Sequence, residues 1–311
     1  MIVSTSRRTD LPAYYTPWLL RRLEEGYALV RNPRSPHSVR RVDLSPAMVD
    51  GLVLWTKNPL PLLPHLDQLS SYPYYFQFTL TGYGPDVEPS LPGKEEALIP
   101  AFEALARTAG KERVVWRYDP IFFSPRYTPA WHQACFSALA QRLHPWVDQC
   151  VVSFIDDYRC MRGRMQALSP LPFTSEAQWA LMEGFSQTAR RFGLRLATCA
   201  EEIDFHSLGV ERACCIDRER LEHLGGFSLH VSKAAHQRPA CGCAESVDLG
   251  AYDTCPAGCR YCYADHSSRG AAHALLQHDP ASPLLIGRLT PLDTVKESPA
   301  RSHRDGQITL F

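Results

Sequence analysis

Short apolar segments alternate with longer amphipathic segments along the first two thirds of the chain. Between the apolar segments, helical spacing of apolar residues predicts helices at 19–29, 95–108, 129–143 and 175–192. The apolar segments themselves, which we predict to be strands, are 2–6, 51–56, 74–80, 113–118, 150–155 and 194–199. Strands and helices that alternate in this way form parallel sheets. The alternation therefore predicts an α/β fold.

The number of strand–helix units narrows the choice of architecture. A chain of 311 residues with six or more such units has the size of a complete or partial (β/α) barrel. The alternative is an open doubly wound sheet. No glycine-rich phosphate loop follows the first predicted strand, which disfavours a dinucleotide-binding fold. We therefore favour the barrel.

Polar residues gather at the end of each predicted strand. Active sites of barrels are built from the carboxyl ends of their strands, so six such ends predict a shared polar mouth. An arginine and a lysine together can hold a carboxylate or a phosphate, and an aspartate can orient an arginine. The candidate catalytic residues at these ends are Arg8, Asp10, Lys57, Arg117 and Asp119.

The charge balance and the hydropathy bear on partners and location. Lys and Arg together number 33, as do Asp and Glu, so the formal net charge is zero. Balanced charge disfavours strong non-specific binding to nucleic acid, which depends on neutralising phosphates. The first ten residues lack the apolar segment of a signal peptide, and no segment approaches the roughly 18 apolar residues of a membrane-spanning helix. These features predict a soluble, cytoplasmic protein without a membrane partner.

Eleven cysteines are unevenly distributed, and eight of them lie between residues 199 and 262. The cytosol is reducing, so disulfides explain them poorly, and clustered cysteines there indicate metal binding or catalysis. Cys255, Cys259 and Cys262 form the pattern C-x-x-x-C-x-Φ-C, with Tyr261 directly before the third cysteine. Thiolates are soft ligands that suit iron–sulfur clusters. Structural zinc takes four protein ligands, so the alternatives are half of a zinc site or free cysteines.

The triad resembles the motif of the radical S-adenosylmethionine (SAM) superfamily. The resemblance implies a [4Fe-4S] cluster with one iron left open to SAM. It also implies reductive cleavage of SAM to a 5′-deoxyadenosyl radical, which abstracts hydrogen from a substrate, and an electron donor such as flavodoxin or ferredoxin. By the same resemblance Tyr261 lies near the adenine of SAM. We also expect Asn58 and Glu201, at the ends of two predicted strands, to contact the cofactor.

In that superfamily the motif usually follows the first barrel strand, whereas here it comes late in the chain. We therefore predict a permuted order, in which the segment 246–252 occupies the place of the usual first strand. The predicted divisions are a barrel body at 1–240, a cysteine-rich iron–sulfur loop at 241–270 that completes the barrel, and an extended tail at 271–311.

Nearly the whole chain also resembles a bacterial family of unknown function that carries this cysteine motif near its C-terminal end. The resemblance rests on the segments 4–10, 55–59, 116–120 and 241–243, together with the triad. It supports the predicted fold and cluster but implies no reaction.

A second cysteine group consists of Cys199, Cys215, Cys241 and Cys243. Cys199 ends a predicted strand, and Cys215 is preferred to the adjacent Cys214 because Ile216 and Asp217 follow it in the family-like pattern. The glycine between Cys241 and Cys243 lets both sulfurs approach one metal. The group could hold a second iron–sulfur cluster or a structural zinc. The alternatives are free thiols, or a redox pair formed by Cys241 and Cys243.

The last five residues, 307–311, resemble the Q-x-x-L-F peptide that bacterial proteins use to bind the DNA sliding clamp. In such a peptide Leu310 and Phe311 would fill a pocket and Gln307 would make the polar contact. The alternative is a tail packed on its own domain. Clamp binding would favour a different function, a DNA-maintenance accessory protein with a structural iron–sulfur or zinc site. A barrel that is non-catalytic or hydrolytic, with structural zinc, is a further alternative.

Overall fold

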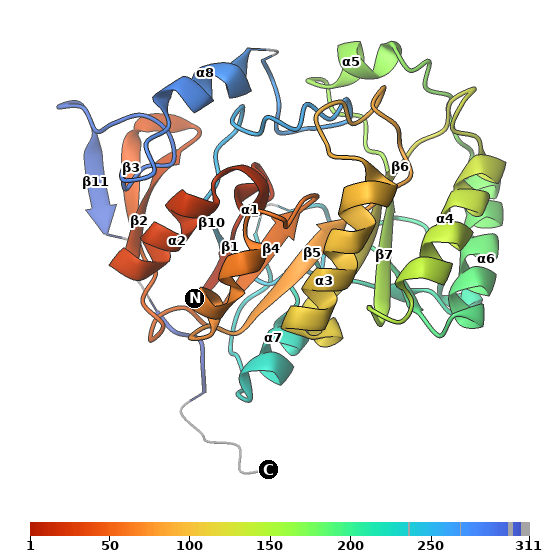
Figure 1. Cartoon of the computed structure of the whole chain (residues 1–311), viewed down its shortest axis with the longest axis horizontal. Helices are drawn as coiled ribbons and strands as arrows, with labels where there is room; N and C mark the ends of the chain where they lie inside the picture. The colour runs from red at the N-terminus through yellow and green to blue at the C-terminus, as the bar shows by residue number, and fades with distance from the viewer. Residues whose placement is uncertain (236, 268, 298–300, 306–311) are drawn as a thin grey trace.

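A parallel sheet of eight strands forms the centre of the molecule (Figure 1). The computed structural model describes all residues except 236, 268, 298–300 and 306–311. The sheet has the order β10-β1-β4-β5-β6-β7-β8-β9, and each neighbouring pair is parallel. The strands are β1 (Ile2–Ser4), β4 (Gly51–Thr56), β5 (Tyr74–Thr79), β6 (Val114–Ile121), β7 (Gln149–Phe154), β8 (Arg195–Thr198), β9 (Glu211–Arg212) and β10 (Val247–Asp248).

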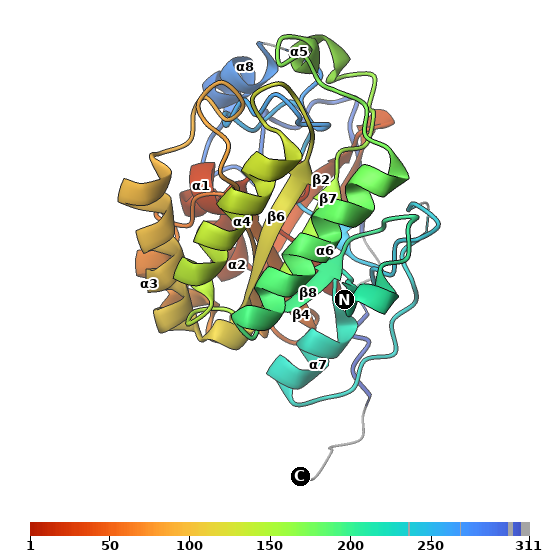
Figure 2. The same ribbon diagram turned by 90° about the vertical axis from the view of Figure 1, so that its right-hand side faces the viewer.

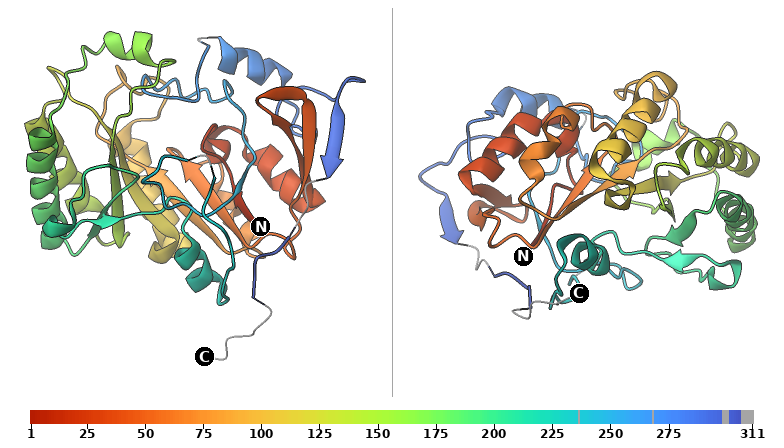
Figure 3. Two further views of the ribbon diagram at one scale, coloured as in Figure 1. Left: turned by 180° about the vertical axis from the view of Figure 1, so that it is seen from behind. Right: turned by 60° about the horizontal axis from the view of Figure 1, so that its bottom comes forward.

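The longer helices cover one face of this sheet, while α7 lies against the other (Figure 3, right). Figure 2 shows α4 and α6 side by side in front of the strands. The α-helices are α1 (Leu11–Tyr14), α2 (Thr16–Glu25), α3 (Ile99–Ala109), α4 (Pro129–Leu143), α5 (Arg162–Gln166), α6 (Ser175–Arg191), α7 (Arg218–Gly225) and α8 (Gly270–Gln277). Shorter helical turns are η1 (Leu63–Leu69), η2 (Lys94–Leu98), η3 (Lys111–Arg113) and η4 (His206–Leu208).

Both faces of the sheet are buried, which explains why its strands read as apolar runs rather than as alternating patterns. Successive side chains of a strand point to opposite faces. Leu52 and Leu54 of β4 therefore pack in the core beneath the long helices, whereas Val53 packs on the inner face with Leu221 of α7. We call the face that α7 covers the inner face.

The sheet is open, so the prediction of a complete barrel is wrong for the described strands. Its two edges are β10 and β9, which do not pair with each other. Each is only two residues long and offers few backbone groups for a closing ladder. The α/β class and the parallel sheet are confirmed. The predicted strand at 246–252 is limited to β10, which pairs with β1 through Val3 and Val247.

A second, three-stranded sheet packs beside the first and was not predicted. It consists of β2 (Tyr27–Asn32), β3 (Ser35–Asp43) and β11 (Thr294–Glu297) in the order β11-β3-β2. The predicted helix at 19–29 ends at Glu25 because Gly26 adopts a left-handed φ of 76°, and the chain then enters β2. The C-terminal segment, predicted as an extended tail, forms α8 and β11 and pairs with β3.

The N-terminal end of α6 has a side-chain cap. Thr174 caps α6, which begins at Ser175, and its hydroxyl accepts a hydrogen bond from the Ala177 amide at 3.3 Å. Among the described residues, no helix has the length and apolar character needed to cross a membrane.

Candidate functional site

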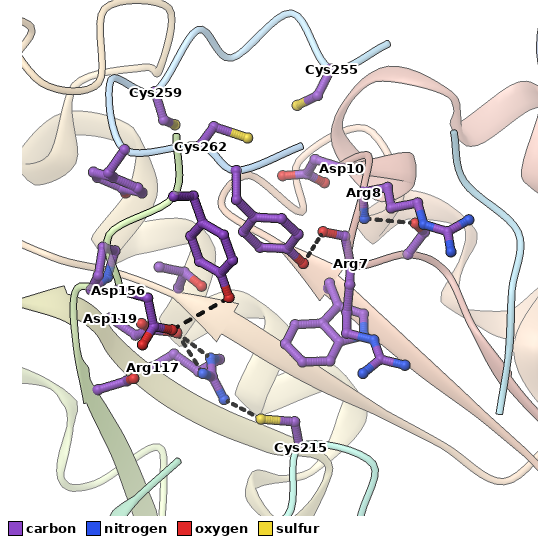
Figure 4. A pocket seen from close by; sticks show the side chains of 18 of the residues that line it. Arg7, Arg8, Asp10, Arg117, Asp119, Asp156, Cys215, Cys255, Cys259 and Cys262 are labelled. Carbon is purple, nitrogen blue, oxygen red and sulfur yellow. Dashed lines mark hydrogen bonds and ion pairs between the residues drawn. The ribbon is translucent and has the colours of Figure 1, made fainter. Parts of the chain in front are cut away.

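A cavity of about 520 Å³ lies at the carboxyl edge of the large sheet. Its walls come from the carboxyl ends of the strands and from the segment 252–265 that carries the cysteine triad (Figure 4). Parallel strands all end at this edge, so residues far apart in the sequence meet here. All five charged candidates predicted from strand ends line the cavity: Arg8, Asp10, Lys57, Arg117 and Asp119.

The cysteine triad projects from one loop into the same cavity. Cys255, Cys259 and Cys262 all belong to the cavity lining, and Figure 4 shows their side chains above Asp10. The loop turns tightly at Gly258, whose φ of +65° favours glycine. The amide of Cys262 donates to the carbonyl of Cys259 at 3.0 Å. The local turn thus directs three sulfurs to one side.

Arg164 of α5 fixes the end of this loop. Its guanidinium donates to the carbonyl oxygens of Asp265 at 2.7 Å and Cys262 at 2.5 Å. A third hydrogen bond runs to the carbonyl of Arg260 at 3.3 Å, and the Asp265 carboxylate lies 3.1 Å away. The Arg164 guanidinium therefore binds three carbonyl oxygens of the loop and acts as a positioning residue for the triad.

The three thiols are neutral when no metal is bound. Burial raises the pKa of Cys255 to about 12 and also raises the pKa of Cys262. Burial raises the pKa of Cys259 well above its ordinary value, although the Lys57 ammonium acts in the opposite direction. A metal that binds thiolates would supply the charge needed to deprotonate them.

A single metal ion and an iron–sulfur cluster require different arrangements of the ligand sulfurs. In the described parts of the chain, no group of three or more His, Cys, Asp or Glu side chains is arranged to hold a single metal ion. A [4Fe-4S] cluster does not require such close sulfurs, because each cysteine binds a different iron. Three soft donors on one loop that faces a cavity fit a cluster.

Tyr261 is part of a buried charge network beside the triad. Lys57 donates from Nζ to the Tyr261 hydroxyl at 2.7 Å and to Glu88 Oε1 at 2.9 Å. The Tyr261 hydroxyl also donates to Glu88, and Lys94 forms an ion pair with the other oxygen of that carboxylate. Burial alone would raise the pKa of Glu88, but the two ammonium groups and the hydrogen bonds lower it to about 2. Glu88 is therefore ionised and holds Lys57 and Tyr261 in place.

Asp10 links the ends of β1 and β4. Its carboxylate accepts hydrogen bonds from the Lys57 amide at 2.7 Å and from the Ala13 amide at 3.0 Å, where it caps α1. Burial raises the pKa of Asp10 to about 6, although these hydrogen bonds act in the opposite direction. The side chain thus fixes the backbone at Lys57 on the cavity floor.

Arg117 and Asp119 form a pair on the strand β6. The guanidinium of Arg117 is only 3% exposed and lies 2.5 Å from Asp119 Oδ2. It also donates to Cys215 Sγ at 3.0 Å and lies over the ring of Trp55. The aspartate is placed to orient the arginine, whose Nη1 is directed at Cys215 Sγ and also approaches Gln77 Oε1 at 3.4 Å.

Arg8 differs from Lys57 and Arg117, as does Arg7, a second arginine of the lining that has no ion pair within the described residues. The Arg8 guanidinium lies over the ring of Tyr252, with its centre 4.9 Å from the ring centroid, and it approaches the Gly250 carbonyl at 3.5 Å. Among the described residues, no carboxylate forms an ion pair with Arg8, whereas Lys57 and Arg117 both have acidic partners. Its charge is therefore available to an anionic ligand.

Two predicted cofactor contacts are not part of the cavity lining. The side-chain oxygen of Asn58 accepts from the Leu60 amide at 3.2 Å and stabilises the turn after β4. Glu201 accepts from Ser153 Oγ at 2.8 Å and from the Phe154 amide at 3.0 Å, so it fixes the end of β7. Both residues stand at strand ends, but their side chains turn to the backbone.

The second cysteine group lies across the cavity from the triad. All four predicted members line it: Cys199, Cys215, Cys241 and Cys243. Cys214, the alternative to Cys215, is outside the lining. Figure 4 shows Cys215 below Arg117, on the opposite side of the view from the triad. The predicted clamp-binding peptide at 307–311 lies outside the described residues.

Sequence reasoning missed the two residues that hold the site together, Glu88 and Arg164. Neither lies at the end of a predicted strand, and neither belongs to a motif. A buried carboxylate with two cationic partners can be recognised only when its neighbours in space are known. The ion pair of Arg238 with Asp156, at 2.5 Å across the cavity mouth, was missed for the same reason.

These features define a class of protein: an α/β fold with an open parallel sheet and a cysteine-lined cavity at its carboxyl edge. Residues 2–264 match the family described as "Domain of unknown function (DUF1848)", and the chain belongs to that family. This confirms the predicted membership of a family of unknown function. The relation to radical SAM enzymes stays a prediction.

Curated proteins and solved structures give no further indication of the function. No curated protein matches the chain. A crystal structure from Bacteroides thetaiotaomicron, provisionally named an alpha-L-fucosidase, is 14% identical over 59% of this chain and 82% of that chain, with a TM-score of 0.29. A TM-score this low carries no argument about fold or function.

Proposed function

We propose that this protein is a radical SAM-type iron–sulfur enzyme. The observation that carries the proposal is the shared cavity, in which three cysteines of one loop face the charged ends of the parallel strands. A structural metal site needs no such cavity, because structural sites are closed by their protein ligands. A cluster that binds a substrate or SAM needs an iron without a protein ligand, and three cysteines would leave one such iron.

Cys255, Cys259 and Cys262 would hold the [4Fe-4S] cluster. When bound, the cluster would pass one electron, taken from a donor such as flavodoxin or ferredoxin, to the sulfonium of SAM, whose carbon–sulfur bond breaks to give methionine and a 5′-deoxyadenosyl radical. The radical would take a hydrogen atom from the substrate. The substrate itself is not identified by these residues.

The residues of the chain would orient the ligands and limit the entry of water. Arg8 would bind a carboxylate, because no ion pair within the described residues neutralises it, and Arg7 of the same lining shares this property. Lys57 and Tyr261 are held rigidly by Glu88 beside the triad, so they would form a fixed wall for SAM. Arg238 and Asp156 would close the mouth of the cavity.

The architecture supports this proposal. Between β1 and β9 the strands of the sheet follow one another in chain order without a reversal, and the long helices lie on one face. A doubly wound sheet reverses its strand order and has helices on both faces. We infer an incomplete (β/α) barrel, in which β10 occupies the edge position next to β1 and brings the triad to the cavity.

The test is anaerobic reconstitution with iron and sulfide, followed by reduction in the presence of SAM. We expect a brown protein that releases 5′-deoxyadenosine. A variant with Cys255→Ser, Cys259→Ser and Cys262→Ser should lose about four irons per chain and all SAM cleavage. Cys135→Ser is the matched control, because Cys135 lies outside this cavity, and it should behave as the wild type. A colourless wild-type protein that contains only zinc would refute the proposal.

A further inference from the structure

The inner face of the sheet carries a second group of cysteines, which the proposed SAM chemistry does not use. Cys199 follows β8, Cys215 lies between β9 and α7, and Cys241 and Cys243 lie in the segment before β10. We call these four residues the inner-wall cysteines. Each is 7% exposed or less, and all belong to one cluster of buried side chains. Three segments of the chain thus bring four thiols to one wall of the cavity.

Three of the inner-wall cysteines, Cys199, Cys215 and Cys243, lie close together, and Cys241 belongs to the same buried cluster. Cys199 Sγ lies 2.9 Å from Cys215 Sγ, and the Ile216 amide, which follows Cys215, donates to Cys243 Sγ at 3.4 Å. The chain passes close to Cys214 at the glycine between Cys241 and Cys243, since a Cβ on Gly242 would lie 2.7 Å from Cys214 Sγ. A side chain at this position would have to displace Cys214 Sγ, which is consistent with glycine in the C-G-C spacing.

A buried cation faces this group. Arg117 donates to Cys215 Sγ at 3.0 Å, and its guanidinium is nearly inaccessible to solvent. A buried guanidinium is costly unless anions surround it, and Asp119 is its only carboxylate partner among the described residues. Thiolates that bind a metal carry the additional negative charge that such a cation stabilises.

The kind of metal is inferred from the exposure of the site to the cavity. All four sulfur-bearing residues line the cavity, whereas structural zinc sites are closed. No single-ion arrangement of three or more such ligands is present in the described residues. In a [4Fe-4S] cluster the four cysteines bind four different irons, so Cys199 and Cys215 would move apart on binding.

We propose that the inner-wall cysteines bind a second [4Fe-4S] cluster, fully ligated by protein and facing the first across the cavity. Because each iron of this cluster has a cysteine, it has no open position for SAM. Its role is to exchange one electron with the donor, the first cluster or a substrate held between the two, with no bond made or broken in the protein.

The test uses the full chain with Cys255→Ser, Cys259→Ser and Cys262→Ser, reconstituted anaerobically with ferrous iron and sulfide. We expect this variant to keep about four irons and four sulfides per chain, with visible absorption and an electron paramagnetic resonance signal on reduction. The wild type should hold about eight irons. A folded variant without iron, or one with stoichiometric zinc instead, would overturn the second cluster.

Single substitutions in the wild-type chain give an independent measurement if the triple variant does not fold. Cys215→Ser should lose about half of the iron, whereas the neighbouring Cys214→Ser should retain all of it, since Cys214 does not line the cavity. Equal iron content in these two variants, or a wild type with only about four irons, would contradict the proposal. Loss of SAM cleavage with the inner-wall iron intact would instead contradict the proposed function alone.

Discussion

The substitution Glu88→Gln tests whether one buried carboxylate holds the floor of the site. Glu88 is 3% exposed and accepts from two ammonium groups and from the Tyr261 hydroxyl. Glutamine keeps the size of the side chain but removes its charge. Lys57 and Lys94 would then face each other across a neutral group, both largely removed from water.

The cost can be worked out in two ways. The pKa of Glu88 falls from 4.5 to about 2 on folding, which corresponds to about 3 kcal/mol of stability at neutral pH. Because this pKa is lowered, that stability is present above pH 4.5 and is lost as the pH falls through about 2. Removing one partner of a buried ion pair usually costs about 3–5 kcal/mol. The pKa shift and the typical cost of breaking a buried ion pair therefore both predict that Glu88→Gln lowers the free energy of unfolding by an amount near the lower end of that range.

The assay is urea unfolding of the metal-free protein at pH 7, under reducing conditions. We expect Glu88→Gln to lower the free energy of unfolding by about 3 kcal/mol. Glu95→Gln is the control, because Glu95 is exposed and pairs with Arg142 only at 3.4 Å, and it should change stability by less than about 0.5 kcal/mol. Adding Lys94→Met to Glu88→Gln should restore part of the loss. A loss below about 1 kcal/mol for Glu88→Gln would refute the reasoning.

Two more predictions follow from single contacts. Burial lowers the pKa of His132 from 6.5 to about 4, so the unfolded chain takes up a proton at a higher pH than the folded chain does. The contribution of His132 to stability should be complete above pH 6.5 and should fall by about 3 kcal/mol as the pH drops from 6.5 to 4. Thermal unfolding of His132→Gln should lack this pH-dependent loss. Arg164→Met removes three hydrogen bonds to the triad loop, so a chelator should remove iron from the triad about tenfold faster. The control is Arg162→Met on the same helix, which should leave the rate of iron removal unchanged because Arg162 is exposed and pairs with Asp157. A wild type whose stability is flat between pH 6.5 and 4, or equal rates for the two arginine variants, would count against these interpretations.

The sequence located the strands of the large sheet well, because strands buried on both faces are short apolar runs with polar ends. Helices α3, α4 and α6 were equally clear, since each shows apolar residues at helical spacing. The hairpin of β2 and β3 was missed because the apolar start of β2 was assigned to the preceding helix, and because β3 is mostly polar and partly exposed. The shortness of the edge strands, which leaves the sheet open, has no signature in a pattern of apolar residues.

The candidate site was predictable to the extent that it depends on strand ends. Arg8, Lys57 and Arg117 could be assigned to one cavity because parallel strands share an edge. Asn58 and Glu201, proposed by the same argument, do not line the cavity, since position along a strand does not fix whether a side chain points into a cavity or back to the protein.

The sequence by itself determined the α/β class and the placement of Cys255, Cys259 and Cys262 on one loop, because these depend on local spacing and on residue type. Only the tertiary structure decided that the two cysteine groups face one cavity, that Glu88 and Arg164 hold it in place, and that Arg117 points at Cys215. These relations join residues between 31 and 173 positions apart. Their energies come from burial and from charge, and both depend on which groups become neighbours when the chain folds.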